Sequence, residues 1–150
     1  MRLVSLFLLS ALAGCTPGAP PAGAVSAAAA TTTIDVSLTS SPVAATAYGN
    51  AGGYTPPVTD VALGTTIRFL NTDSFAHTAS SLSGTSFPPS SPFTGAALNQ
   101  SGGTLSGGWT SGALNPNSAS QTLLADKTGT YLYGCFFHYG SPMRGAIVVH

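Results

Sequence analysis

Residues 129–149, GTYLYGCFFHYGSPMRGAIVV, carry the clearest pattern in the chain. The alternation in its first part sends Tyr131, Tyr133 and Cys135 to one face of an extended strand. A loop with Gly, Ser and Pro follows, and GAIVV then returns as a run of mostly β-branched residues. The pattern predicts two strands joined by a loop, with a Cys, a His and a Met close together.

Further strands are predicted along the chain, and no segment has a helical period. The composition, with 18 Gly and 11 Pro, also argues against a helical domain. We therefore expect an all-β domain built as a β-sandwich. The other predicted strands are TIDVSLT (33–39), with Ile34, Val36 and Leu38 on one face; TTIRFLN (65–71), with Ile67 and Phe69 inward and Arg68 outward; and SQTLLA (120–125).

Residues 81–117 are too long and too rich in Gly, Ser and Pro for a plain turn. We interpret them as an excursion from the sandwich. Its aromatic residues Phe87, Phe93 and Trp109 are predicted to anchor it to the domain rather than to bind a ligand. Two placements remain open: the excursion covers the end of the sandwich that carries the 135–143 loop, or it decorates an edge.

Charge is scarce, with four Lys and Arg, four Asp and no Glu, for a formal net charge of zero. The sequence offers no basic patch for nucleic acid and no acidic tail for a partner. Binding to nucleic acid is therefore not expected.

The N-terminus has the features of an export signal. Met1 and Arg2 precede the apolar run LVSLFLLSALA, which is too short to span a bilayer, and LAGC follows at residues 12–15. This ending resembles the lipobox of bacterial lipoprotein precursors, which implies a signal peptide over residues 1–14 and a lipid on Cys15. Ordinary cleavage further on, for instance in SAAAA, is the alternative.

Residues 15–31 consist mainly of Ala, Pro, Gly and Thr and are predicted to be a flexible tether, with the folded domain over residues 32–150. The chain contains only two cysteines. If Cys15 carries lipid or is removed, Cys135 has no disulfide partner and remains a lone thiol in an exported protein.

Cys135, His138 and Met143 together suit a copper ion that changes oxidation state, because thiolate and thioether favour Cu(I) and imidazole tolerates both states. A second imidazole is needed, and His77, just after a predicted strand, is the one that a sandwich could bring alongside. His150, the last residue, is expected to be exposed and without a role.

The two segments that contain these residues resemble the plastocyanin and pseudoazurin group of cupredoxins. Residues 129–149 have the spacing C-x2-H-x4-M with the framing G-x-Y-x-Y-x-C and M-x-G-x-I-x-V. Residues 61–78, VALGTTIRFLNTDSFAHT, resemble the strand and loop that carry the first His ligand, as V-x-x-G-x-x-I-x-F-x-N-x-D-x-x-x-H.

This resemblance implies a Greek-key β-sandwich that holds one copper ion near one end. It makes His77, Cys135 and His138 the close ligands and Met143 the weak axial ligand, as in blue copper sites. Tyr131 resembles the corner tyrosine of the family and is expected to pin its strand.

The loop departs from many relatives because Phe136 and Phe137 stand where a small residue and a Pro are common, and because Pro142 directly precedes Met143. The ligand spacing is kept, so we expect the site to form. In the family, the second His is the usual exit for the electron. A docking surface for a partner is therefore expected around His138, with Phe136, Phe137, Tyr139 and Pro142.

All four ligand positions are filled by protein, which leaves no open position of the kind that catalytic metals retain. We therefore expect no enzyme, but a monomeric carrier that passes single electrons from a redox donor protein to an acceptor. It would lie on the periplasmic or cell-surface side of a bacterial membrane, anchored by its lipid. The alternatives are a lipoprotein that stores or delivers copper and a metal-free module for adhesion or assembly.

Overall fold

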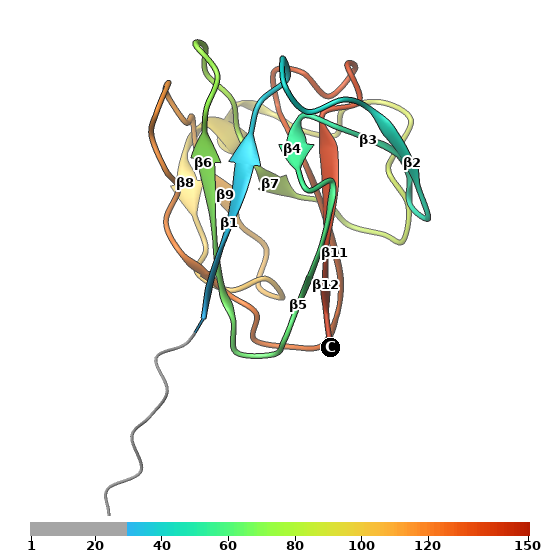
Figure 1. Ribbon diagram of the computed structural model, residues 1–150, viewed down its shortest axis with the longest axis vertical. Coiled ribbons are helices and arrows are strands. Elements are labelled where there is room, and N and C mark those ends of the chain that lie inside the picture. Colours follow the sequence, from blue (N-terminus) through green and yellow to red (C-terminus); the bar gives the residue numbers. More distant parts are fainter. Residues whose placement is uncertain (1–29) are drawn as a thin grey trace, which may run out of the picture.

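The computed structural model describes residues 30–150 (Figure 1), so the predicted signal peptide, Cys15 and most of the predicted tether lie outside the described residues. The described part is almost entirely β-structure, with one short 3-10 helix, η1. It contains no helix with the length and hydropathy needed to cross a membrane. The elements are β1 (Thr31–Val36), β2 (Ala44–Thr46), β3 (Gly49–Ala51), β4 (Tyr54–Thr55), β5 (Val58–Val61), β6 (Thr66–Asn71), β7 (Ser80–Ser81), η1 (Gly95–Leu98), β8 (Gln100–Ser101), β9 (Thr110–Ser111), β10 (Leu123–Leu124), β11 (Gly129–Gly134) and β12 (Arg144–Val149).

The strands form two main sheets and a separate hairpin. One sheet has the order β10-β6-β1-β4, the other has the order β5-β12-β11-β7-β9-β8, and β2 pairs with β3. β1 runs parallel to β6, while β11 and β12 are antiparallel neighbours joined by the 135–143 loop. The predicted β-sandwich is confirmed, and all five predicted strands are present. The shorter strands β2–β5 and β7–β9 were not predicted.

The core lies between the sheets and follows the alternation of the sequence. Ile34 and Val36 of β1 and Ile67 and Phe69 of β6 are completely buried, while Arg68 points outward, as predicted. Leu38 differs from the prediction, because β1 ends at Val36 and the chain turns there. Leu38 is therefore only partly buried and packs against the core from outside the strand.

Four aromatic rings fill the centre of the core. Phe69 stacks on Trp109 with 5.3 Å between ring centroids, and Tyr133 lies edge-on to Phe69 at 5.1 Å and to Tyr54 at 4.8 Å. Such pairs are favourable beyond the area they bury. Tyr131, on the same strand as Tyr133, donates its hydroxyl hydrogen to the carbonyl oxygen of Lys127 at 2.8 Å, so its predicted role of pinning the strand is confirmed.

The 81–117 excursion takes both placements that the sequence left open: it lies at a sheet edge and it reaches the end of the sandwich. Through β9 and β8 it extends the larger sheet at its edge. It also reaches the end of the sandwich near His77, where the backbones of Leu114 and His77 exchange two hydrogen bonds of 2.8 and 3.1 Å. Trp109 is buried and Phe87 and Phe93 are half-buried, which confirms that these aromatics are anchors.

Candidate metal centre

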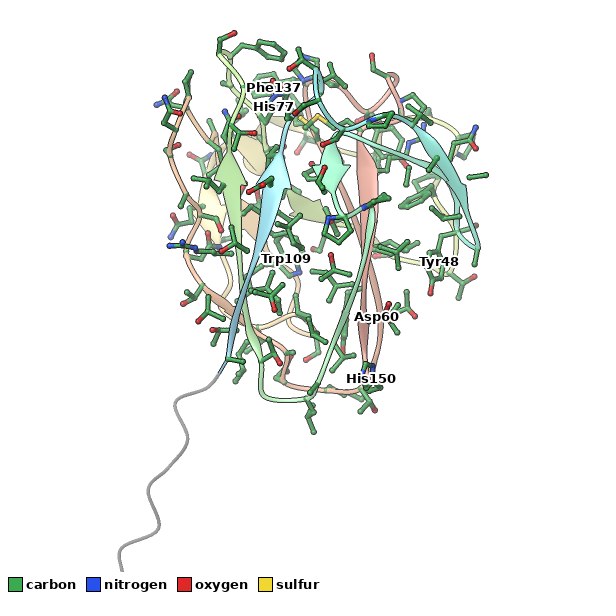
Figure 2. All side chains as sticks on the ribbon, in the orientation of Figure 1. Tyr48, Asp60, His77, Trp109, Phe137 and His150 are labelled. Carbon is green, nitrogen blue, oxygen red and sulfur yellow. The ribbon has the colours of Figure 1, made fainter. Side chains whose placement is uncertain are left out.

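Three sequence-predicted ligands meet at one end of the sandwich. His77 lies between β6 and β7, Cys135 follows directly after β11, and His138 lies in the turn that follows. Their ligand atoms all lie within 4.8 Å of one another. Figure 2 shows His77 at the upper end of the domain, with sulfur drawn beside it.

The spacing of these atoms fits a single metal ion. Cys135 Sγ lies 3.9 Å from His77 Nδ1 and 3.7 Å from His138 Nδ1, and the two Nδ1 atoms are 3.2 Å apart. Bonds of about 2.0–2.1 Å to nitrogen and about 2.3 Å to sulfur, as known for zinc, put trigonal ligands about 3.5–3.8 Å apart. One thiolate and two imidazoles with a thioether nearby is the donor set of blue copper rather than of structural zinc.

His77 is completely buried and its ring is held by its outer nitrogen. Nε2 lies 2.9 Å from Oδ2 of Asp73, and a carboxylate can only accept from the ring. In the neutral imidazole the proton therefore sits on Nε2, which leaves the Nδ1 lone pair facing Cys135 and His138. A metal ligand oriented by an outer carboxylate is a common arrangement in proteins.

Asp73 is itself buried and hydrogen-bonded from several sides. Ser37 Oγ donates to Oδ1 at 2.8 Å, and the backbone N–H of Leu38 donates to Oδ2 at 2.6 Å. Burial acts to raise the pKa of Asp73, but the hydrogen bonds from Thr39, His77 and the other donors outweigh it and lower the pKa to about 2. The Asp73 carboxylate is therefore ionised at any pH well above 2.

The Cys135 thiol is free and completely buried. The backbone N–H of Thr78, next to His77, donates to Sγ at 3.4 Å and so helps to fix the position of the sulfur. The backbone N–H of Cys135 donates to the carbonyl oxygen of Met143 at 3.0 Å, and that of Phe136 donates to Thr78 Oγ1 at 2.8 Å. These bonds tie both ends of the ligand loop to each other and to the His77 segment.

Met143 is completely buried at the end of the same loop and belongs to the same packed cluster as Cys135. Its side chain lies against Gly53, whose φ is +73°. A Cβ placed on Gly53 would overlap Met143 Cγ and lie 3.2 Å from Sδ. The axial role of Met143 stays a prediction, but its side chain is confined by this contact.

His138 is only partly buried, unlike His77. Burial and the neighbouring His77 lower its pKa, against the opposite effect of Asp73. A lowered pKa favours the neutral imidazole that a metal requires. His150 is exposed at the opposite end of the domain and takes no part in the cluster, as predicted.

Around His138 lies an exposed group of apolar side chains, which we call the apolar cap. Phe137 is 45% exposed and Phe75 is 37% exposed, and their ring centroids lie 6.1 and 5.5 Å from that of His138. Phe136 and Pro142 are half-buried beside them on the loop. The cap is defined as Phe75, Phe136, Phe137, His138 and Pro142.

The expectation that Tyr139 lies on this surface is wrong. Tyr139 is only 2% exposed, because its hydroxyl donates to the carbonyl oxygen of Pro88 at 2.9 Å and its ring packs against Phe93. Arg144 covers the same ring at 4.1 Å. The excursion thus buries Tyr139, which the loop sequence alone did not indicate.

Sequence reasoning missed three residues at the centre: Asp73, Phe75 and Gly53. Asp73 was part of the quoted pattern, four positions before His77, and that spacing was the available signal. Phe75 contacts both imidazoles, with 4.8 Å between its ring centroid and that of His77, but nothing in the sequence marked it.

No protein-family model and no curated protein matches the chain, but solved structures do. A reduced tryptophan-to-tyrosine mutant of amicyanin is 17% identical over 83% of this chain and 87% of its own, with a TM-score of 0.50. The Cu(I) form of a methionine-to-alanine mutant of amicyanin is 18% identical over 89% of this chain and 95% of its own, also with a TM-score of 0.50. A purple cupredoxin from Nitrosopumilus maritimus is 20% identical over 79% of this chain and 98% of its own, with a TM-score of 0.48.

The likeness to the amicyanin structures shows the fold. The domain is a cupredoxin-type Greek-key β-sandwich, as the sequence resemblance implied. At the end of this sandwich it has a His-Cys-His cluster able to hold one metal ion, in which His77 and Cys135 are buried and His138 is partly exposed.

Proposed function

We propose that the protein is a mononuclear type 1 (blue) copper protein that carries single electrons between redox partners outside the cytoplasm. The observation that carries the proposal is the convergence of His77 Nδ1, Cys135 Sγ and His138 Nδ1 within 4.8 Å in a cupredoxin-type fold. A bound copper ion would supply one-electron chemistry between Cu(II) and Cu(I).

The residues of the chain supply the rest of the function. In this proposal Met143 would supply the fourth ligand, which would leave no position open for a substrate, so we propose a carrier rather than an enzyme. The buried residues His77, Cys135 and Met143 would shield a bound ion from water on that side. His138 is the ligand nearest to solvent and lies within the apolar cap, where a donor or an acceptor protein would dock.

The arrangement also suits an anchored carrier. Figure 1 shows β1 rising from the lower end of the domain, and Figure 2 places His77 and Phe137 at the upper end. A lipid on Cys15 would therefore attach the domain through the end opposite to its metal site, and the tether that the sequence predicts over residues 15–31 would leave the site free to reach a partner. Mass spectrometry of the mature N-terminus tests this part: an unmodified start beyond residue 15 would contradict it.

An optical spectrum of the copper-loaded full chain tests the central proposal. We expect an intense blue colour from charge transfer between thiolate and Cu(II), and reversible one-electron voltammetry. Cys135→Ser should abolish the colour and leave the β-structure intact, while Ser83→Ala, at an exposed site in the excursion, should change neither. A colourless copper complex, or a Cys135→Ser variant that stays blue, would contradict the site. Tight copper binding without reversible redox would point instead to storage or delivery.

A further inference from the structure

The outer nitrogen of His77 makes the one ionic contact found among the described residues. His77 Nε2 and Asp73 Oδ2 are 2.9 Å apart, with side-chain exposures of 0% and 3%. The two residues are four positions apart in the segment that follows β6. Any role of this pair in tuning a metal ion rests on the copper site proposed above.

The charge of Asp73 is not offset by a basic side chain. Across residues 30–150, no Lys or Arg lies within ion-pair distance of this carboxylate. Its other partners are the neutral donors Ser37 Oγ, Thr39 Oγ1 and the backbone N–H of Leu38. A negative charge that is held by dipoles and shielded from water acts strongly on a charge nearby.

The position of the carboxylate is fixed from two strands. Asp73 follows β6, whereas its donors Ser37, Leu38 and Thr39 follow β1, the parallel neighbour of β6. The backbone N–H of Asp73 also donates to Oδ1 of Asn71 at 2.9 Å. Asp73 cannot turn away without breaking several of these bonds, and the His77 ring cannot turn without losing its bond to Asp73.

We infer that Asp73 is a positioning residue of the copper site, which holds the proton of His77 on Nε2 and favours the oxidised ion. With one thiolate and one carboxylate, Cu(II) makes the local charge zero, whereas Cu(I) leaves it at minus one. Removal of the Asp73 charge therefore destabilises Cu(II) more than Cu(I), and the reduction potential rises.

Asp73→Asn, made in the full chain and loaded with copper, tests this inference. Loss of an outer-shell partner typically lowers metal affinity by about 10- to 100-fold. If the ratio of Cu(II) to Cu(I) affinity falls tenfold, the potential rises by about 59 mV for this one-electron couple. The matched control is Asp60→Asn, which removes the same charge from an exposed site in the lower half of the domain (Figure 2) and should leave the potential unchanged.

A second variant keeps the charge and predicts the opposite sign. Thr39→Val removes one donor to Asp73, which makes the carboxylate a stronger acceptor for His77 and should lower the potential. This variant also gives a result if Asp73→Asn fails to fold. A potential that does not move in either variant beyond the Asp60→Asn control would overturn the inference.

A metal-free readout separates this inference from the copper function. Nitrogen-15 NMR of His77 in the metal-free protein should show the proton on Nε2 in the wild type and a shift toward Nδ1 in Asp73→Ala, which, unlike Asn, has no oxygen to accept from Nε2–H. A wild type that never becomes blue contradicts the proposed function, but the NMR result still tests the positioning role. A His77 tautomer that is the same in both proteins would contradict that role.

Discussion

Gly53→Ala should destabilise the metal-free protein much more than an equivalent substitution elsewhere, because of its contact with Met143. A Cβ on Gly53 would overlap Met143 Cγ, and the backbone cannot withdraw freely, since the N–H and carbonyl of Gly53 bond to Ser41 and Ser37 at 3.0 Å. The positive φ costs about 1–2 kcal/mol. Overpacking of a filled core adds about 1–3 kcal/mol.

Gly64→Ala is the matched control. Gly64 also has a positive φ, +86°, but a Cβ there meets no atom within 4 Å. Gly64→Ala should therefore lose only the free energy that a positive φ costs. The free energies of unfolding of the two variants should then differ by the cost of overpacking, about 1–3 kcal/mol. Unfolding in guanidinium, followed by circular dichroism, measures this difference.

The assignment of the difference to Met143 can be checked with a double-mutant cycle. Met143→Ala makes space for the new methyl group, so Gly53→Ala should cost less in that background, with a coupling of about 0.5–3 kcal/mol. Equal stabilities of Gly53→Ala and Gly64→Ala, or zero coupling, would refute the claim that Gly53 confines the Met143 side chain.

Three further predictions concern the site and its surface. Met143→Gln should keep the copper centre but lower its reduction potential in voltammetry, because an oxygen ligand stabilises Cu(II); an equal or higher potential would argue against axial ligation. Phe137→Lys should slow electron exchange with a redox partner and leave the optical spectrum unchanged. The control Leu63→Lys changes an exposed residue in the loop that bonds to His150 and should leave the exchange rate unchanged. Equal exchange rates in the two variants would place docking elsewhere. The metal-free domain should not unfold at about pH 4–5. The folded pKa of Asp73, about 2, lies below its ordinary value of 3.8, so the stabilisation that its ionised form supplies, on the order of 2 kcal/mol, is complete above pH 3.8 and is lost only as the pH falls toward 2. Acid titration followed by circular dichroism checks this, and a cooperative loss of structure near pH 4–5 would contradict it.

The longer strands could be predicted, either from alternation between core and solvent or from runs of β-branched and aromatic residues. β1 and β6 alternate because one face of each is buried in the sandwich, whereas β11 and β12 have buried residues on both faces and are marked by their residue types. The two-residue strands β7, β8 and β9 show no period, since two residues cannot alternate detectably. They exist because the larger sheet offers them an edge to pair with.

The residues of the metal centre also differ in how far the sequence alone predicts their position. Cys135 and His138 could be predicted as neighbours because a strand end and a tight turn keep them together whatever the rest of the chain does. His77 lies far away in sequence, and only its framing by a strand and the family pattern pointed to it. The structure brings it to 3.2 Å from His138, between Nδ1 atoms, because β6 and β11 lie in facing sheets.

The β-class of the domain, the order and spacing of the ligands and the scarcity of charge can all be read from the sequence, because they depend on composition and on neighbours along the chain. Three features required the folded structure: Tyr139 is buried, Phe75 packs against both imidazoles, and Asp73 accepts a hydrogen bond from His77. The physical reason is that each depends on a contact between a side chain and a separate segment. Burial of Tyr139 requires Pro88 of the excursion, and the hold of Asp73 on His77 requires donors that follow β1.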